Sequence, residues 1–200
     1  MKNILFIILI PLFLIIFYNN TALEINKTDF DSISELQSKQ YTQTKLYVDK
    51  IHIGMTIQEM KDVYTSANFI EEPVYKYGID GESNGLVVEE NGNRLFFVWT
   101  LENENEIRGI TIISKDIKID DNVSVGMTLA EFIKKYPEAT LAIDLIDNKY
   151  EFSYVAKLKY RIEFLTTDST RVAEYSFGEG EPEYIKIINL KKKVDRISLY

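Results

Sequence analysis

The chain has 200 residues, of which 46% are hydrophobic, 12% aromatic and 27% charged, and this balance is typical of a folded globular protein. Its formal net charge of −8 disfavours a nucleic-acid partner, because an acidic surface repels the phosphate backbone. The sequence contains no Cys, which excludes disulfide bonds, Cys-based zinc sites, catalytic thiols and a lipid-modified N-terminal Cys.

The first 22 residues have the pattern of a secretory signal peptide. Lys2 is followed by an uncharged apolar run over residues 4–17, which is shorter than the ~20 residues that a transmembrane helix needs. The sequence YNNTA that follows favours cleavage after Ala22, with an uncleaved N-terminal anchor as the alternative. We therefore expect a protein that is exported to the periplasm or the extracellular space and is not lipid-anchored. Only an uncleaved segment 1–22 would attach it to a membrane.

After a polar segment over residues 23–45, which we interpret as a tether, the sequence contains two stretches that match each other. DKIHIGMTIQEMKDVY at residues 49–64 aligns with DNVSVGMTLAEFIKKY at residues 121–136, with identical Asp, Gly, Met, Thr, Glu and Tyr. Further along, RLFFV resembles RIEFL, and IRGITI resembles VDRISL, in the same order. Such self-similarity predicts a tandem duplication, with repeat units at residues 46–117 and 118–200.

Each matched stretch predicts the start of a short helix. Gly54 allows a sharp turn, Thr56 can cap the helix with its hydroxyl, and Glu59 completes a capping box. Met55 before the cap and Met60 within the helix have the spacing of a hydrophobic staple. The alternative to a helix start is a ligand-binding loop, but every residue of the motif already has a structural role in starting a helix. The residues assigned to the two helix starts are Gly54, Met55, Thr56, Glu59, Gly126, Met127, Thr128 and Glu131.

Antiparallel strands are predicted after each helix. In the first half, Asn91-Gly92 is a strong hairpin-turn signal between apolar runs at 85–90 and 94–100, and a third strand is expected at 107–114. In the second half, strands are expected at residues 150–156, 159–167, 172–177, 184–190 and 194–200. The predicted fold class is α+β, with two tandem units, each a short helix followed by an antiparallel β-meander, and with the helices on one side of the sheet.

The Gly-Met-Thr sequences at residues 54–56 and 126–128, with the helix and meander behind each, resemble the superfamily of β-lactamase inhibitory proteins and BamE (SmpA/OmlA) lipoproteins. The tandem arrangement is more similar to the inhibitors, which have two such units side by side. The resemblance implies an exported, non-catalytic, protein-binding module. Because the sequence has no Cys, neither the inhibitors' disulfides nor the lipoproteins' anchor carries over, and no partner-contact residue is transferred.

The sequence gives little support for catalysis. His52 is the only His, and it lies between two Ile residues at a position that Ser124 takes in the second half. The acidic runs ENENE and GEGEPE are typical of solvated loops and lack the ligand spacing of a calcium loop. We therefore expect no catalytic residue, no metal and no cofactor. The alternatives are a secreted or periplasmic carboxylate-based hydrolase, because paired carboxylates meet only in the folded protein, and a carrier of a small apolar ligand.

Strand alternation predicts one buried and one exposed face for the sheet. Leu95 and Phe97 align with Ile162 and Phe164, and these four apolar residues are expected in the core. An exposed face would then carry two Arg and an aromatic ring, which are residue types enriched at protein interfaces. We predict an exported, non-enzymatic module that binds a protein partner through this face, with packing against the other unit as the alternative. The predicted binding residues are Arg94, Phe96, Arg161 and Glu163.

Overall fold

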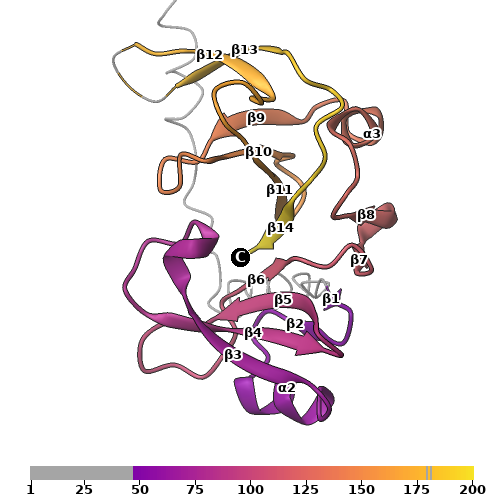
Figure 1. Ribbon diagram of the computed structural model, residues 1–200, viewed down its shortest axis with the longest axis vertical. Helices are drawn as coiled ribbons and strands as arrows, with labels where there is room; N and C mark the ends of the chain where they lie inside the picture. Colours follow the sequence, from indigo (N-terminus) through magenta and orange to yellow (C-terminus); the bar gives the residue numbers. More distant parts are fainter. Residues whose placement is uncertain (1–46, 179, 181) are drawn as a thin grey trace, which may run out of the picture. The chain divides into compact units, whose positions relative to one another are not determined.

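The computed structural model describes residues 47–178, 180 and 182–200, and in this part of the chain the protein is α+β, with two short α-helices and mostly antiparallel strands (Figure 1). Residues 47–117 contain β1 (Tyr47–Val48), β2 (Ile51–His52), α2 (Ile57–Val63), β3 (Asn68–Pro73), the 3-10 helix η1 (Val74–Tyr77), β4 (Asn84–Glu90), β5 (Asn93–Trp99) and β6 (Gly109–Ile112). Residues 118–200 contain β7 (Lys118–Ile119), the 3-10 helix η2 (Asp120–Asn122), β8 (Val123–Ser124), α3 (Leu129–Lys135), β9 (Thr140–Ile143), β10 (Tyr150–Tyr154), β11 (Tyr160–Leu165), β12 (Ala173–Ser176), β13 (Glu183–Ile187) and β14 (Arg196–Leu199).

The main sheet has eight antiparallel strands in the order β3-β4-β5-β6-β14-β11-β10-β9, and it is open at both edges. The pairing of β6 with β14 joins the strands of the first half to those of the second. Thr111 and Ser198 face each other in this pairing, and their hydroxyl oxygens are 3.1 Å apart. Outward from this pair the strands follow in the reverse order of the chain on both sides, so β5 corresponds to β11 and β4 to β10.

Both helices begin with the same hydrogen bonds. The Thr56 hydroxyl accepts from the Glu59 backbone N–H at 3.1 Å, and the Glu59 carboxylate accepts from the Thr56 N–H at 2.8 Å. Thr128 and Glu131 repeat this capping box at 3.2 and 2.8 Å. The preceding glycines, at residues 54 and 126, have φ angles of +86° and +88°, a region that strongly favours glycine. The two helix starts therefore share one backbone conformation as well as one sequence.

One face of the sheet, called here the core face, carries the main hydrophobic cluster. Phe96 and Val98 of β5 and Ile162 and Phe164 of β11 are fully buried in it. Residues of both helices belong to the same cluster, and Met60, Leu129 and Phe132 are inaccessible to solvent.

A β-bulge in β5 changes the predicted alternation. Val88 pairs with Phe96 and the next residue, Glu89, pairs with Arg94, so Leu95 is an extra residue between them. Phe97, which was aligned with Phe164 and expected in the core, lies in a separate cluster on the opposite face. The face assignment is thus correct for β11 and inverted for Phe96 and Phe97.

Edge strands β3 and β9, directly after the helices, were not predicted from the sequence. The signal peptide at 1–22 and the tether at 23–45 lie outside the described residues. Within the described residues, none of the helices combines the length and the apolar character needed to cross a bilayer.

Candidate protein-binding face

The face of the sheet opposite the core face, called here the second face, is covered in the first half of the chain. The ring of Tyr77 from η1 stacks on Phe97, with centroids 3.7 Å apart and an interplanar angle of 7°. Val74 of η1 and Val87 of β4 complete this small cluster, and all four residues are buried. The 3-10 helix η1 therefore closes the second face over β4 and β5.

The corresponding position in the second half carries a charge. In β5, Phe97 pairs across the sheet with Thr111, and in β11, Arg161 pairs with Ser198. Because Thr111 and Ser198 face each other at the centre of the sheet, Arg161 takes the place in β11 that Phe97 takes in β5. The 3-10 helix η1 has no counterpart here, because a six-residue connection at 144–149 joins β9 to β10.

An open groove of about 540 Å³ occupies this uncovered part of the second face. Four of its ten lining residues are aromatic, and of these Tyr154 and Tyr200 keep 40% and 60% of their surface exposed. The second-face side chains that line the groove are Phe152, Tyr154, Arg161 and Tyr200, whereas Tyr160 lines its edge but is buried in the main core. The sequence motifs did not identify Tyr154 or Tyr200, because isolated tyrosines carry no recognisable spacing.

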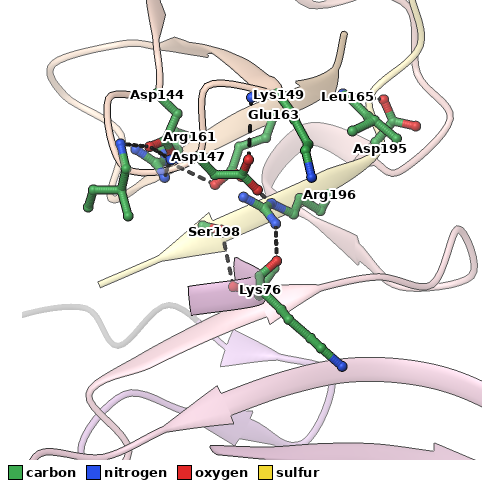
Figure 2. Close-up of polar contacts among 12 residues, drawn as sticks. Lys76, Asp144, Asp147, Lys149, Arg161, Glu163, Leu165, Asp195, Arg196 and Ser198 are labelled. Atoms are coloured by element: carbon green, nitrogen blue, oxygen red, sulfur yellow. Dashed lines mark hydrogen bonds and ion pairs between the residues drawn. The ribbon is translucent and has the colours of Figure 1, made fainter. Parts of the chain in front are cut away.

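Figure 2 shows a buried cluster of four charged residues, one of which, Arg161, also lines the groove. Glu163 has no exposed side-chain surface, and its carboxylate accepts from Nε of Arg161 at 2.8 Å and from Nε of Arg196. Nη2 of Arg161 also donates to Oδ2 of Asp144 at 2.8 Å. Two guanidinium groups and two carboxylates make the cluster neutral, so each buried charge has an opposite charge in contact, as burial requires.

Aromatic rings hold both guanidinium groups in place. Arg161 lies 4.5 Å from the Phe152 centroid and 5.5 Å from the Tyr200 centroid, and Arg196 lies 3.6 Å from that of Tyr150. Burial acts to lower the pKa of Arg161, but the neighbouring Glu163 charge and the other acidic groups outweigh it and raise that pKa. Burial, with Glu163 and Asp144 nearby, raises the pKa of Tyr200 to about 12. At neutral pH Arg161 is therefore charged, and Tyr200 presents a neutral hydroxyl to the groove.

The cluster also binds the first half of the chain. Nη1 of Arg196 donates to the backbone carbonyl of Lys76 in η1 at 2.9 Å (Figure 2). Gly78, which ends η1 with a left-handed φ of +70°, lies directly against the cluster. A Cβ atom at this position would lie 2.9 Å from Oδ2 of Asp144 and 3.1 Å from Nη2 of Arg196.

Replacing Gly78 with alanine should lower the free energy of unfolding by about 2–3 kcal/mol, because left-handed backbone strain of about 1–2 kcal/mol adds to crowding against buried charges. Urea titration followed by Trp99 fluorescence would measure the loss. Gly92→Ala is the matched control, since Gly92 has a similar φ of +77° but an added Cβ would meet nothing within 4 Å. Equal losses in the two variants would show that the packing of Gly78 on the cluster contributes nothing.

The four residues predicted to bind a partner do not lie together. Arg161 lines the groove, whereas Glu163 is outside the lining and has no exposed surface. Arg94 donates to the Tyr77 hydroxyl and to Glu72, both at 2.8 Å, beside a smaller hollow of about 280 Å³. Phe96 is fully buried in the main core, 5.4 Å from the ring of Tyr64, so its predicted place on an exposed face is wrong.

His52 has a local structural environment. Its Nδ1 is 2.9 Å from the carbonyl oxygen of Ile53, and its ring packs edge-on against Tyr47 at 5.1 Å. Among the described residues, no group of three or more His, Asp or Glu side chains is arranged to hold a metal ion.

No protein-family model, curated protein or solved structure matches this chain.

Proposed function

We propose that this protein is an exported, non-enzymatic binding protein, which engages a protein partner through the groove on the second face of its sheet. The observation that carries the proposal is the contrast between the two halves. The surface over Phe97 is closed by η1, whereas the corresponding surface over Arg161 is open and lined with aromatic rings.

The chemistry of the groove supports a protein as the partner. Tyrosine and arginine are enriched among the residues that contribute most to protein–protein binding, because they combine a large apolar area with polar ends. Tyr154, Arg161 and Tyr200 supply both properties over adjacent strands. Two carboxylates and two rings fix Arg161 before any partner arrives, so little side-chain entropy is lost on binding.

The alternatives receive less support. A carboxylate-based hydrolase needs an acid and a base free to exchange protons, but Asp144 and Glu163 are both engaged by the guanidinium of Arg161. A carrier of small apolar ligands needs an enclosed cavity, but the groove of about 540 Å³ is open to solvent.

The tandem organisation is part of the same proposal. We interpret residues 46–117 and 118–200 as two copies of one unit, because the capping boxes, the glycine conformations and the mirrored strand order recur in both. Divergence after duplication would leave one second face closed and the other open. This interpretation, with the resemblance to the β-lactamase inhibitory protein and BamE-like superfamily, favours binding over catalysis.

Affinity capture from the native envelope or culture fluid tests the proposal when paired variants are compared. A genuine partner should be retained by the wild-type protein and lost with Tyr154→Ala, with a loss of affinity of about tenfold or more, as expected for an aromatic contact residue. Tyr184→Ala is the matched control, because Tyr184 is 42% exposed, close to the 40% of Tyr154, but lies on β13 outside the groove. Retention that is equal in the two variants, or hydrolysis abolished by Asp144→Asn, would refute the proposed role of the groove.

A further inference from the structure

Two connecting segments run beside the two helix starts in the same way. In the first half, the backbone N–H of Ile57 donates to the carbonyl of Asn105 at 2.8 Å. In the second half, the N–H of Leu129 donates to the carbonyl of Lys192 at 2.9 Å. Asn105 and Lys192 therefore occupy equivalent backbone positions, one in each half.

Neighbouring residues preserve the equivalence. Thr56 forms an isolated β-bridge with Glu106, and Thr128 forms one with Lys193. Each bridge consists of the hydrogen bond already named and a second one, from the Ile107 N–H to the Met55 carbonyl and from the Val194 N–H to the Met127 carbonyl, both at 2.8 Å. Side chains at equivalent positions therefore project from closely similar frames. Glu104, one residue before Asn105, therefore corresponds to Lys191, one residue before Lys192.

The charges at these equivalent positions are opposite. Glu104 and Glu106 of the first segment correspond to Lys191 and Lys193 of the second. Further along, Arg108 corresponds to Asp195, so the sign is reversed there too. We call Glu102, Glu104 and Glu106 the acidic corner, and Lys191, Lys192 and Lys193 the basic corner.

Both corners are accessible and have apolar neighbours. The three glutamates are exposed, as are Lys191 and Lys193. Leu101 beside the acidic corner is 47% exposed, and Ile188 and Leu190 beside the basic corner are 55% and 48% exposed. Arg108 pairs with Glu104 at 2.7 Å and Asp195 lies 3.8 Å from Lys192, so the acidic corner keeps a net charge of −2 and the basic corner one of +2. Each corner thus combines an excess of one sign of charge with apolar surface, which is the composition of a docking surface.

The basic corner contrasts with the rest of the chain. Residues 46–117 carry 13 acidic and 6 basic side chains, whereas residues 118–200 carry 14 and 13. Three consecutive lysines in a chain with a net charge of −8 form a local positive surface, and the chain itself carries the complementary surface on an equivalent frame.

We propose that two copies of this chain associate, with the acidic corner of each copy on the basic corner of the other. A twofold axis between the copies makes both contacts at once, and the opposite charges pair Glu104 and Glu106 of one copy with Lys191 and Lys193 of its partner. This association uses surfaces outside the groove on the second face, so it is independent of the proposed function.

Charge reversal tests the pairing without relying on salt, since low salt also strengthens the repulsion between two acidic copies. One variant carries Glu104→Lys and Glu106→Lys, and the other carries Lys191→Glu and Lys193→Glu. Each variant alone places like charges at both contacts and should weaken dimerisation more than about tenfold. A mixture of the two restores opposite charges at both contacts, so sedimentation velocity at fixed ionic strength should again detect a dimer.

Matched controls separate local pairing from net charge. Lys115→Glu with Lys118→Glu, and Glu71→Lys with Glu82→Lys, make the same changes in net charge at exposed positions outside the corners, and both should dimerise like the wild type. Circular dichroism should be unchanged in all variants. A wild-type protein that stays monomeric at every concentration would overturn the proposal. So would a mixture that fails to dimerise, or a monomer that binds anionic vesicles through Lys191 and Lys193.

Discussion

Replacing Phe96 with alanine should lower the free energy of unfolding by about 3–5 kcal/mol, the usual loss when a fully buried Phe is truncated. Phe96 has no exposed surface, and its ring meets Tyr64 edge-on in the main core. The variant loses both the transfer free energy of the ring and the contacts around the cavity that remains. Chemical denaturation with Trp99 fluorescence, supported by circular dichroism, would measure the change.

The same experiment discriminates between the two assignments of Phe96. Removing a ring from an exposed binding face would lower the free energy of unfolding by less than about 0.5 kcal/mol, as is usual for surface positions. Phe177→Ala is the matched control, because Phe177 is 72% exposed and its replacement should lower the free energy of unfolding by no more than this amount. A small loss with Phe96→Ala would mean that this residue is not in the core and that the bulge in β5 is misplaced.

Replacing Glu163 with alanine should destabilise the protein by about 3–5 kcal/mol, the cost of removing one partner from a buried ion cluster. Glu163 is fully buried and accepts from both Arg161 and Arg196. Without it two guanidinium groups face each other, and only Arg161 keeps a carboxylate partner, at Asp144. Equilibrium unfolding at neutral pH would measure the loss.

Two further variants show whether charge is responsible. Glu163→Gln keeps the shape and one acceptor but removes the charge, so it should also destabilise the protein, and by less than the alanine variant. Glu138→Ala removes the partner of Lys157 from an exposed ion pair, at 2.7 Å, and should have little effect. If Glu163→Ala were as mild as Glu138→Ala, the cluster would have no role in stability.

Local features of the fold could be predicted because the interactions that cause them are local. The capping boxes at Thr56 and Thr128 involve residues three positions apart, so the sequence contains all of their partners. The hairpin between β4 and β5 follows from Asn91 and Gly92, both of which have positive φ angles.

Features that depend on distant partners could not be predicted in this way. β3 contains Glu71, Glu72 and Pro73, which weaken the strand pattern although all three pair with β4 at the sheet edge. The bulge at Leu95 reverses the predicted alternation downstream of it, so Phe96 lies in the core and not on the face predicted to be exposed. No sequence rule fixes the position of such a bulge.

The candidate site was predicted only in part for the same reason. Arg161 was correctly placed on the face opposite the core, but Asp144, which accepts from it, and Arg196, which shares Glu163 with it, lie 17 and 35 positions away along the chain. Their contacts exist only after β9, β11 and β14 have assembled, so no local motif in the sequence identifies either residue.

The central pairing of β6 with β14 has a consequence for how the chain folds. Thr111 and Ser198 are 87 positions apart, so during synthesis the first half emerges long before the strand that completes it. Until then β6, whose four residues are all buried in the finished sheet, presents a bare strand edge to other nascent chains. We therefore expect a late, high-contact-order closure of the sheet, with the exposed edge of β6 open to aggregation until β14 pairs with it.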